Sequence, residues 1–179
     1  MRIVAGKYRH RNIEWPNDNI NIRPTKDRIR EAIFSALGDI TNFNVLDLFA
    51  GSGAMGIEAL SREAKWAYLV DNNKVAISTI KNNIHTLNAN NSTVLFMDAF
   101  LALEKFKQEN IQFDLVILDP PYEKGNYIGA ISSLLNNKLV KENAILVIER
   151  NHPINYDSFD FENIKEYHYG DIEVDIIRL

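Results

Sequence analysis

The sequence of 179 residues contains no cysteine, and this absence limits the chemistry that the chain can perform. It excludes disulfide bonds, thiolate metal sites and every mechanism that needs a cysteine nucleophile. Apolar runs long enough to span a bilayer are also missing, and the start, MRIVAGKYRHRN, has no apolar signal-peptide core. We therefore expect a cytoplasmic protein with one sizeable core, and the chain length suits a single domain.

Acidic residues are scarce at the N-terminal end, although the whole chain has a net charge of -4. Residues 1–30 hold eight Lys and Arg against three Asp and Glu, a local charge of +5 that leaves -9 for the remainder. A basic segment on an acidic body predicts a polyanionic partner that is met by one end of the molecule. A merely solvated basic surface would give the same counts.

Beyond residue 40, short apolar segments alternate with segments of helical periodicity. The predicted strands are residues 44–49, 66–71, 93–98, 113–119 and 144–150. Between the second and third strands, apolar residues recur at helical spacing, at Ile77, Ile80, Ile84 and Leu87. This alternation indicates an α/β fold with a parallel sheet and right-handed crossovers. The tail, IKEYHYGDIEVDIIRL, has two strand-like runs that meet at Gly170 and Asp171, which predicts a closing antiparallel hairpin.

The first 40 residues read as an extension of a single domain over residues 1–179. The segment RIVAGKYRHRNIEW predicts a small hairpin around Gly6 and Lys7. The segment RPTKDRIREAIFSALG predicts a helix, with Thr25 as N-cap and Asp27 in the first turn. Its buried stripe comprises Ile29, Ala32, Ile33, Ala36 and Leu37, and Arg28 and Arg30 fall off this stripe.

A glycine-rich turn follows the first predicted strand, in VLDLFAGSGAMG. Gly51, Gly53 and Gly56 form a GxGxxG pattern between a strand and a helix, where glycine permits a tight turn and close approach of a ligand. Asp71 ends the next strand, 20 positions after Gly51, and an acid there can accept both hydroxyls of a ribose. Together these features predict an adenosine-bearing ligand at the carboxyl ends of the strands.

Two further acids favour S-adenosylmethionine over NAD as that ligand. Asp47, at the end of the first strand, is placed to hold the amino group of a methionine moiety, a role without a counterpart on a pyrophosphate. Asp98 ends the third strand, where it can reach the exocyclic amine of adenine while the Ala99 N–H meets a ring nitrogen. The chain is also short for a dehydrogenase with its own substrate domain. Either acid could instead cap the following helix, and for Asp98 this alternative is strong.

The segment FDLVILDPPYEKG changes abruptly from a buried strand to two prolines, which cannot continue a sheet ladder. If this strand neighbours the first one, Asp119 and Pro120 lie beside the glycine turn. The exocyclic amine of a nucleobase is a weak nucleophile, because its lone pair is delocalised into the ring. Acceptors at Asp119 and at the Pro120 carbonyl can hold its N–H groups and aim the lone pair, while Pro121 stiffens the turn. Tyr122 offers a face on which the base can stack.

The motifs LDLFAGSG and LDPPY resemble those of the class I, Rossmann-like methyltransferases that modify exocyclic amines with S-adenosylmethionine. The N-terminal segments RIVAGKYRHRNI and RPTKDRIREAIFSAL, followed by LFAGSGAMGIEALSR and DPPY, narrow the resemblance to the RsmD family of bacterial 16S ribosomal RNA guanine-N2 methyltransferases. The resemblance implies a seven-stranded, mostly parallel sheet with helices on both faces. It also implies that the substrate is ribosomal RNA or an assembling small subunit. The transfer through Asp119 and Pro120 needs no metal and no covalent intermediate, and a small enzyme of this type could act as a monomer.

The predicted site residues follow from these motifs. Cofactor binding is assigned to Asp47, Phe49, Ala50, Gly51, Ser52, Gly53, Asp71, Asn72, Asp98 and Ala99. The predicted catalytic residues are Asp119, Pro120, Pro121 and Tyr122, and the predicted RNA contacts are Lys7, Tyr8, Arg9, Arg11 and Arg23. Because DPPY also occurs in adenine-N6 methyltransferases, that activity on DNA or RNA remains an alternative. An NAD-dependent oxidoreductase and a non-catalytic RNA-binding protein are alternatives of other classes.

Overall fold

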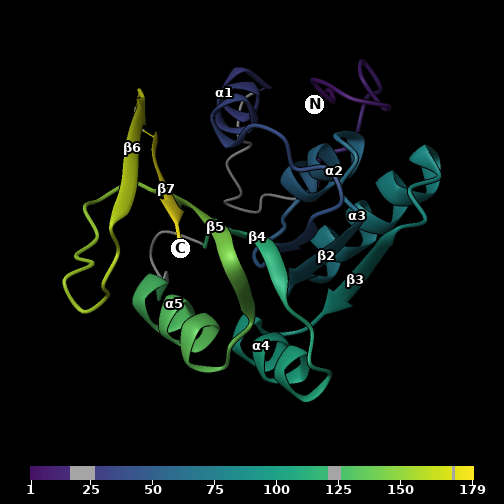
Figure 1. Cartoon of the computed structure of the whole chain (residues 1–179). Coiled ribbons are helices and arrows are strands. Elements are labelled where there is room, and N and C mark those ends of the chain that lie inside the picture. Colours follow the sequence, from purple (N-terminus) through teal and green to yellow (C-terminus); the bar gives the residue numbers. More distant parts are fainter. Residues whose placement is uncertain (17–26, 121–125, 171) are drawn as a thin grey trace.

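The computed structural model describes residues 1–16, 27–120, 126–170 and 172–179. Its centre is a seven-stranded sheet in the order β3-β2-β1-β4-β5-β7-β6 (Figure 1). The strands are β1 (Asn44–Asp47), β2 (Trp66–Asp71), β3 (Ser92–Phe96), β4 (Phe113–Leu118), β5 (Val140–Arg150), β6 (Asn163–Tyr169) and β7 (Ile172–Arg178). The first five pair in parallel, and β7 lies antiparallel between β5 and β6. The predicted parallel sheet with a closing antiparallel hairpin is therefore confirmed.

Helices cover both faces of the sheet (Figure 1). They are α1 (Asp27–Leu37), α2 (Ala54–Ser61), α3 (Lys74–Leu87), α4 (Ala99–Gln108) and α5 (Tyr127–Asn136). Apolar side chains of α1, α2 and α3 form one core with one face of the sheet, and those of α4 and α5 form a second core on the other face. Central strands are thus buried on both sides, which explains their almost continuous apolar sequence. None of the described helices is long and apolar enough to cross a membrane.

The predicted strand boundaries are wrong mainly at the carboxyl ends. β1 ends at Asp47 instead of residue 49, β3 ends at Phe96 instead of residue 98, and β4 ends one residue early at Leu118. The first residue after β1 and after β3 still donates one hydrogen bond to a neighbouring strand, from Leu48 to Ile117 and from Met97 to Asp71, and the chain then enters turns and helix caps. β5 begins four residues earlier than predicted, at Val140, which pairs with Phe113 of β4. The register then shifts, and regular pairing resumes at Ile145 opposite Leu115.

β1 and β4 are neighbours, and this adjacency positions the site. From β1, the chain first moves outward through β2 and β3, and then returns to β4 and β5 on the other side of β1. The carboxyl ends of β1 and β4 therefore flank the point at which the strand order reverses, where open α/β sheets bind their ligands. The expected neighbourhood of the glycine turn and residue 119 is confirmed.

Residues 1–16, called the N-terminal arm below, form the predicted small hairpin. Arg2 and Asn12 make an antiparallel bridge, and the Ile3 N–H donates to the Arg11 carbonyl at 2.9 Å. Gly6 turns the chain with φ of +79°, a conformation that favours glycine. Ile3 and Ile13 are buried in the core shared with α1, α2 and α3. The arm is therefore packed on the sheet domain through its own apolar residues.

The buried carboxylate of Glu58 in α2 fastens this arm to the body. It accepts the N–H groups of Val4 at 2.9 Å and Ala5 at 3.0 Å, and it pairs with Arg62 at 2.9 Å and Arg30 at 3.4 Å. Arg30 also donates to the Arg2 carbonyl. The placement of Arg30 outside the buried stripe of its helix was wrong, because its side chain is fully buried and this carboxylate compensates its charge. Arg28 is exposed, as its position off the stripe predicts.

Candidate active site

Four carboxylates gather at the carboxyl ends of β1, β2, β4 and β5. Asp47 is the last residue of β1. Its register partner in β2 lies two residues before Asp71, and its register partner in β4 lies two residues before Asp119. That β4 residue pairs in turn with the β5 residue that lies two positions before Glu149. Because side chains alternate along strands, the four acids share one face, which is the face covered by α1, α2 and α3.

Two of these acids hold the glycine turn. The Gly51 N–H donates to Asp71 Oδ2 at 2.8 Å, and the Gly56 N–H donates to Asp47 Oδ2 at 2.9 Å. Gly51 and Gly53 have φ of +54° and +78°, so the turn uses the left-handed backbone region that glycine permits. Asp47 and Asp71 therefore both lie beside the loop between β1 and α2, and each holds one of its backbone N–H groups.

The third glycine serves close packing. A Cβ atom added at Gly56 would lie 2.9 Å from Leu69 Cδ2 and 3.3 Å from Asp47 Oδ2. Such contacts leave no room for a side chain, so α2 begins directly against β2 and β1. This is the role that the last glycine of such a turn has in helix–sheet packing.

The other predicted cofactor residues lie around this turn. Asn72 follows β2 and is exposed, and the next residue, Asn73, caps α3 by accepting the N–H groups of Val75 and Ala76. Asp98 caps α4, because its Oδ1 accepts the N–H groups of Phe100 at 2.8 Å and Leu101 at 3.3 Å. The capping alternative for Asp98 is thus what the structure shows. Both cap bonds end on one oxygen, and Asp98 is exposed at the carboxyl end of β3.

Burial perturbs the acids of the site. It raises the pKa of Asp47 from 3.8 to about 7, partly opposed by the Gly56 N–H, while the charge of Asp71 raises it further. Burial likewise raises the pKa of Asp71, against the lowering effect of three backbone N–H groups. The pKa of Asp119 lies well above 3.8, first because of burial and then because of the charges of Glu149 and Asp47. Such a desolvated anionic cluster favours a cationic ligand.

Asp119 and Pro120 follow β4 directly. Pro120 is buried, whereas Asp119 keeps part of its surface exposed at the edge of the sheet. The chain thus has a backbone carbonyl and a carboxylate on consecutive residues at the switch point. Pro121 and Tyr122, the other two predicted catalytic residues, lie outside the described residues.

A polar network that the sequence did not reveal anchors the end of β5. The Tyr127 hydroxyl donates to the Glu149 carbonyl at 3.0 Å. The next residue, Arg150, is buried and pairs with Asp175 at 2.6 Å, with Glu166 at 2.8 Å, and with Glu173. Alternation turns Arg150 toward the α4 and α5 face, opposite to Glu149. The strand end beside Asp119 is therefore anchored from the α4 and α5 face, through the Glu149 carbonyl and the Arg150 side chain.

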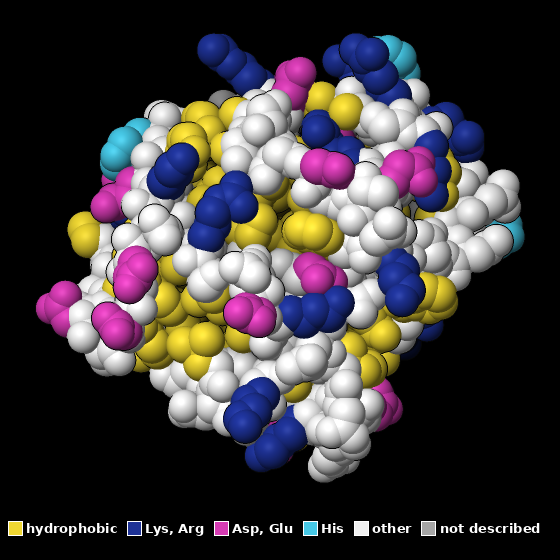
Figure 2. Space-filling view, viewed as in Figure 1, with side chains coloured by type: hydrophobic (Ala, Val, Ile, Leu, Met, Phe, Trp, Pro, Cys, Tyr) yellow, Lys and Arg dark blue, Asp and Glu magenta, His cyan; other side chains and the backbone are white. Residues whose placement is uncertain are grey.

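The predicted RNA contacts lie on the N-terminal arm. Lys7, Arg9 and Arg11 are exposed, and Figure 2 shows Lys and Arg side chains gathered over this part of the surface, at the upper right. Arg11 Nη2 donates to the Thr86 carbonyl near the end of α3 at 2.9 Å, which uses one of its five N–H donors. Tyr8 is half-buried, with the Lys7 ammonium 5.2 Å from the centre of its ring. Arg23 lies outside the described residues.

Asn83 of α3 joins the arm to the glycine turn, and its sequence context gave no sign of this role. Its Oδ1 accepts the Glu14 N–H at 2.7 Å, and its Nδ2 donates to the Glu14 carbonyl at 3.1 Å. The same Nδ2 donates to the Ser52 carbonyl at 3.2 Å. Ser52, a predicted cofactor residue, is buried, and its carbonyl accepts this bond from α3.

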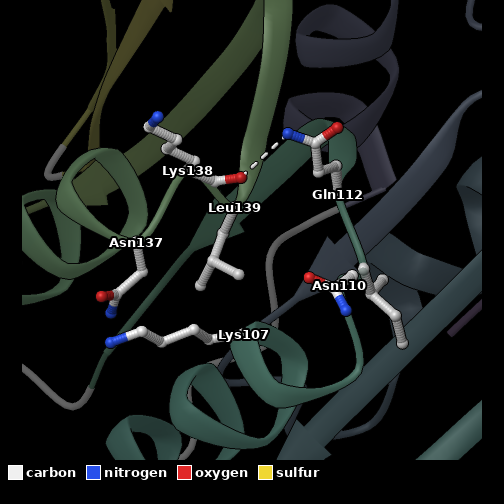
Figure 3. Close-up of a pocket in the computed structure, with 7 residues that line it drawn as sticks. Lys107, Asn110, Gln112, Asn137, Lys138 and Leu139 are labelled. Atoms are coloured by element: carbon white, nitrogen blue, oxygen red, sulfur yellow. Dashed lines mark hydrogen bonds between the residues drawn. The ribbon is translucent and has the colours of Figure 1, made fainter.

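A separate polar pocket lies at the opposite, amino-terminal edge of the sheet (Figure 3). It is lined by Lys107, Asn110, Ile111, Gln112, Asn137, Lys138 and Leu139. Gln112 Nε2 donates to the Lys138 carbonyl across it at 2.9 Å. The two lysines stand at the C-terminal ends of α4 and α5, where positive charge offsets the helix dipoles. This pocket is remote from the four acids and contains no carboxylate.

Comparison with known proteins agrees with this geometry. The model of the family described as Conserved hypothetical protein 95 matches residues 1–178. The chain belongs to this family. The match includes both the glycine turn and β4 with the Asp119 that follows it, because it spans almost the whole sequence.

Relatives with more specific names share about a third of their residues with this chain. "Ribosomal RNA small subunit methyltransferase D" of Buchnera aphidicola is 38% identical over 83% of this chain and 76% of its own length. The protein of the same name from Escherichia coli is 35% identical over 83% of this chain and 74% of its own. A solved structure, "Putative methyltransferase yhhF from Escherichia coli", superposes with a TM-score of 0.85 at 30% identity, covering 99% of this chain and 97% of its own. The predicted class I methyltransferase fold and the predicted family are confirmed.

Proposed function

We propose that the protein is a methyltransferase that moves a methyl group from S-adenosylmethionine to the exocyclic N2 amine of a guanine in 16S ribosomal RNA. One observation carries the chemistry: Asp119 and the Pro120 carbonyl lie at the end of β4, beside the glycine turn that follows β1. The relatives named as small-subunit ribosomal RNA methyltransferases support the substrate. An intact or assembling small subunit is the partner, met in the cytoplasm by a single copy of the chain.

The residues at the turn suit this cofactor. S-adenosylmethionine carries a sulfonium and an ammonium group, and it supplies an electrophilic methyl group when bound. The acids Asp47 and Asp71 complement those positive charges, whereas a pyrophosphate of NAD would meet two desolvated acids. Asp47 would hold the amino group and Asp71 the ribose hydroxyls. Asp98 and the Ala99 N–H would bind the adenine.

The backbone of Phe49, Ala50, Gly51, Ser52 and Gly53 would line the methionine part of that site. The Ala50 N–H is engaged with the Val70 carbonyl at 2.9 Å, and the Gly53 N–H with the Ala50 carbonyl at 2.6 Å. The turn is therefore preorganised by its own hydrogen bonds, and a ligand does not have to order it. Asn72, exposed after Asp71, would lie along the adenosine.

The residues of this chain promote the reaction by positioning the guanine amine and by accepting its surplus proton. Asp119 and the Pro120 carbonyl accept the two N–H groups of the guanine amine and direct its lone pair toward the methyl group. The N2–C bond forms as the C–S bond breaks, and the electron pair of that bond stays on sulfur. The surplus proton on N2 passes to the Asp119 carboxylate, whose raised pKa suits it to receive a proton. Tyr122 and Pro121, the next two residues of the motif, would support the base.

The arm supplies the RNA-binding extension of the single domain. Lys7, Arg9 and Arg11, with Arg23, would bind backbone phosphates, which fix position without reading sequence. The arm is tied to α2 by Glu58 and to α3 by Asn83, so RNA held there is held at a fixed distance from the site. Tyr8 would add a stacking surface on its exposed side.

Replacing Asp119 with Ala tests the catalytic assignment. Turnover should fall at least 100-fold, because the guanine amine loses a hydrogen-bond acceptor and the carboxylate that takes up its surplus proton. S-adenosylmethionine affinity should change less than threefold. Isothermal titration and methyl-transfer rates on small-subunit particles measure the two quantities. Asp114→Ala is the matched control on the same strand, since Asp114 bonds Asn44 and Lys141 at the other end of β4. Equal losses of affinity and turnover in Asp119→Ala would contradict its role at the amine.

A further inference from the structure

Glu149 occupies a position at the site that no motif predicts. The Cα partners Leu118 and Ile148 are in register, so Asp119 and Glu149 are the next residues of two adjacent strands. Adjacent strands lie about 4.8 Å apart, and the two side chains leave the same face of the sheet. The influence of Glu149 on the pKa of Asp119 is larger than that of Asp47, which agrees with this placement.

The position of Glu149 is rigid. Its side chain is buried, with 6% of the residue exposed, and its carbonyl accepts the Tyr127 hydroxyl at 3.0 Å. The following residue, Arg150, is bound on the opposite face by Asp175 and Glu166. A carboxylate on such a fixed strand end is suited to reading one atom of a ligand, because little conformational freedom is lost on binding.

Guanine and adenine differ beside their exocyclic amines. In guanine, the N2 amine adjoins the N1–H, so its Watson–Crick edge presents neighbouring donors. In adenine, the N6 amine adjoins N1, which carries a lone pair. A carboxylate next to the acceptors that hold the amine therefore gains a charge-assisted hydrogen bond from guanine and meets a repelling lone pair in adenine.

We propose, resting on the function proposed above, that Glu149 selects guanine by accepting the N1–H while Asp119 and the Pro120 carbonyl hold the N2 amine. Two acids on neighbouring strands then read two adjacent donors of one base. Negative charge at N1–H also pushes electron density toward N2, so the contact promotes transfer as well as selection. The preference of this chain for guanine is thus set by a residue outside the motif that is shared with adenine-N6 enzymes.

The test compares two acceptors that differ at N1. Small-subunit particles are assembled from unmodified ribosomal RNA with either guanosine or 2-aminopurine ribonucleoside at the target, whose position is first mapped with the wild-type protein by mass analysis. 2-Aminopurine keeps the amine but has a lone pair at N1 and lacks the O6 carbonyl. Wild-type protein should prefer guanosine at least 100-fold in kcat/KM, since a site built to bond a donor rejects an analogue that lacks it.

Glu149→Gln should lower this preference below tenfold, because its amide can donate to N1 of 2-aminopurine as readily as it accepts from guanosine. Activity on guanosine should fall at least tenfold. Glu142→Gln, an exposed position near the start of β5, should leave the preference unchanged. Affinity for S-adenosylhomocysteine and the thermal unfolding midpoint monitor the folded site in both variants.

The outcomes separate this inference from the proposed function. An equal loss on both acceptors, or an unchanged preference in Glu149→Gln, would overturn the reading of N1–H by Glu149 while N2-methylguanosine from the wild type upholds the function. Label in N6-methyladenosine from the wild type would overturn both. A preference that collapses only in the Glu149 variant supports the assignment, because a structural role would not alter the ratio between two acceptors.

Discussion

Replacing Asp47 with Asn should make the ligand-free protein more stable at alkaline pH and weaken cofactor binding. Asp47 is buried at the end of β1, and burial raises its pKa from 3.8 to about 7. Between these pH values, the folded state holds a proton that the unfolded state has released. Rising pH therefore destabilises the wild-type fold across this window, and the destabilisation is complete above the folded pKa.

The shift sets the size of the effect. About three pKa units at 1.36 kcal/mol each give a ceiling of about 4 kcal/mol for the stability lost between pH 4 and pH 8. Asparagine keeps an oxygen for the Gly56 N–H but adds an amide NH₂ that needs a partner, which costs about 1–3 kcal/mol at every pH. Relative to wild type, Asp47→Asn should thus gain about 4 kcal/mol from pH 4 to pH 8, and it should be the more stable protein at pH 8.

Urea unfolding of ligand-free protein at pH 4.5, 6 and 8 measures this difference. Asp160→Asn, at an exposed position in the segment between β5 and β6, is the control and should stay within about 0.5 kcal/mol of wild type. Isothermal titration should show at least tenfold weaker S-adenosylmethionine binding by Asp47→Asn at pH 8. A stability difference that does not grow with pH would refute the argument that Asp47 is a strained, buried acid.

Two further predictions concern the arm. Gly6→Ala should destabilise the protein by about 2 kcal/mol more than Gly38→Ala. Both positions have positive φ, but only a Cβ atom at Gly6 would collide with a neighbour, since it would lie 1.8 Å from the Ser61 carbonyl oxygen. Equal urea midpoints for the two variants would contradict the docking of the arm. Combined Arg9→Ala and Arg11→Ala should reduce the slope of log K for RNA binding against log salt by about two at most, whereas an unchanged slope in filter-binding titrations would show that the arm does not touch phosphates.

The sequence predicted the parts of the site that depend on local order along the chain. Gly51 and Asp119 each follow a buried strand. The alternation of strands and helices along the chain therefore places both at the carboxyl edge of the sheet, and the structure agrees. It did not predict the position of Glu149 beside Asp119, because a strand pattern does not reveal the register of a strand with its neighbour. Only the pairing of β4 with β5 brings that acid next to Asp119.

Contacts between distant segments were equally hidden. Arg30 looked like a surface residue on the helical wheel of α1, but Glu58 lies 28 positions farther along the chain and compensates its charge inside the protein. Asn83 looked like one polar residue of α3, although it binds Glu14, 69 positions away. Periodicity reports which face of an element is apolar, and it contains no information about a polar partner that another element supplies.

The most direct test of the proposed function is methyl transfer from labelled S-adenosylmethionine to small-subunit particles assembled from unmodified ribosomal RNA, followed by digestion to nucleosides and mass analysis. We expect label in N2-methylguanosine, and we expect this label to be lost in Asp119→Ala. Label in N6-methyladenosine would keep the site and contradict the base. Absence of label, with cofactor binding demonstrated in the same preparation, would contradict the proposal that this chain methylates small-subunit ribosomal RNA.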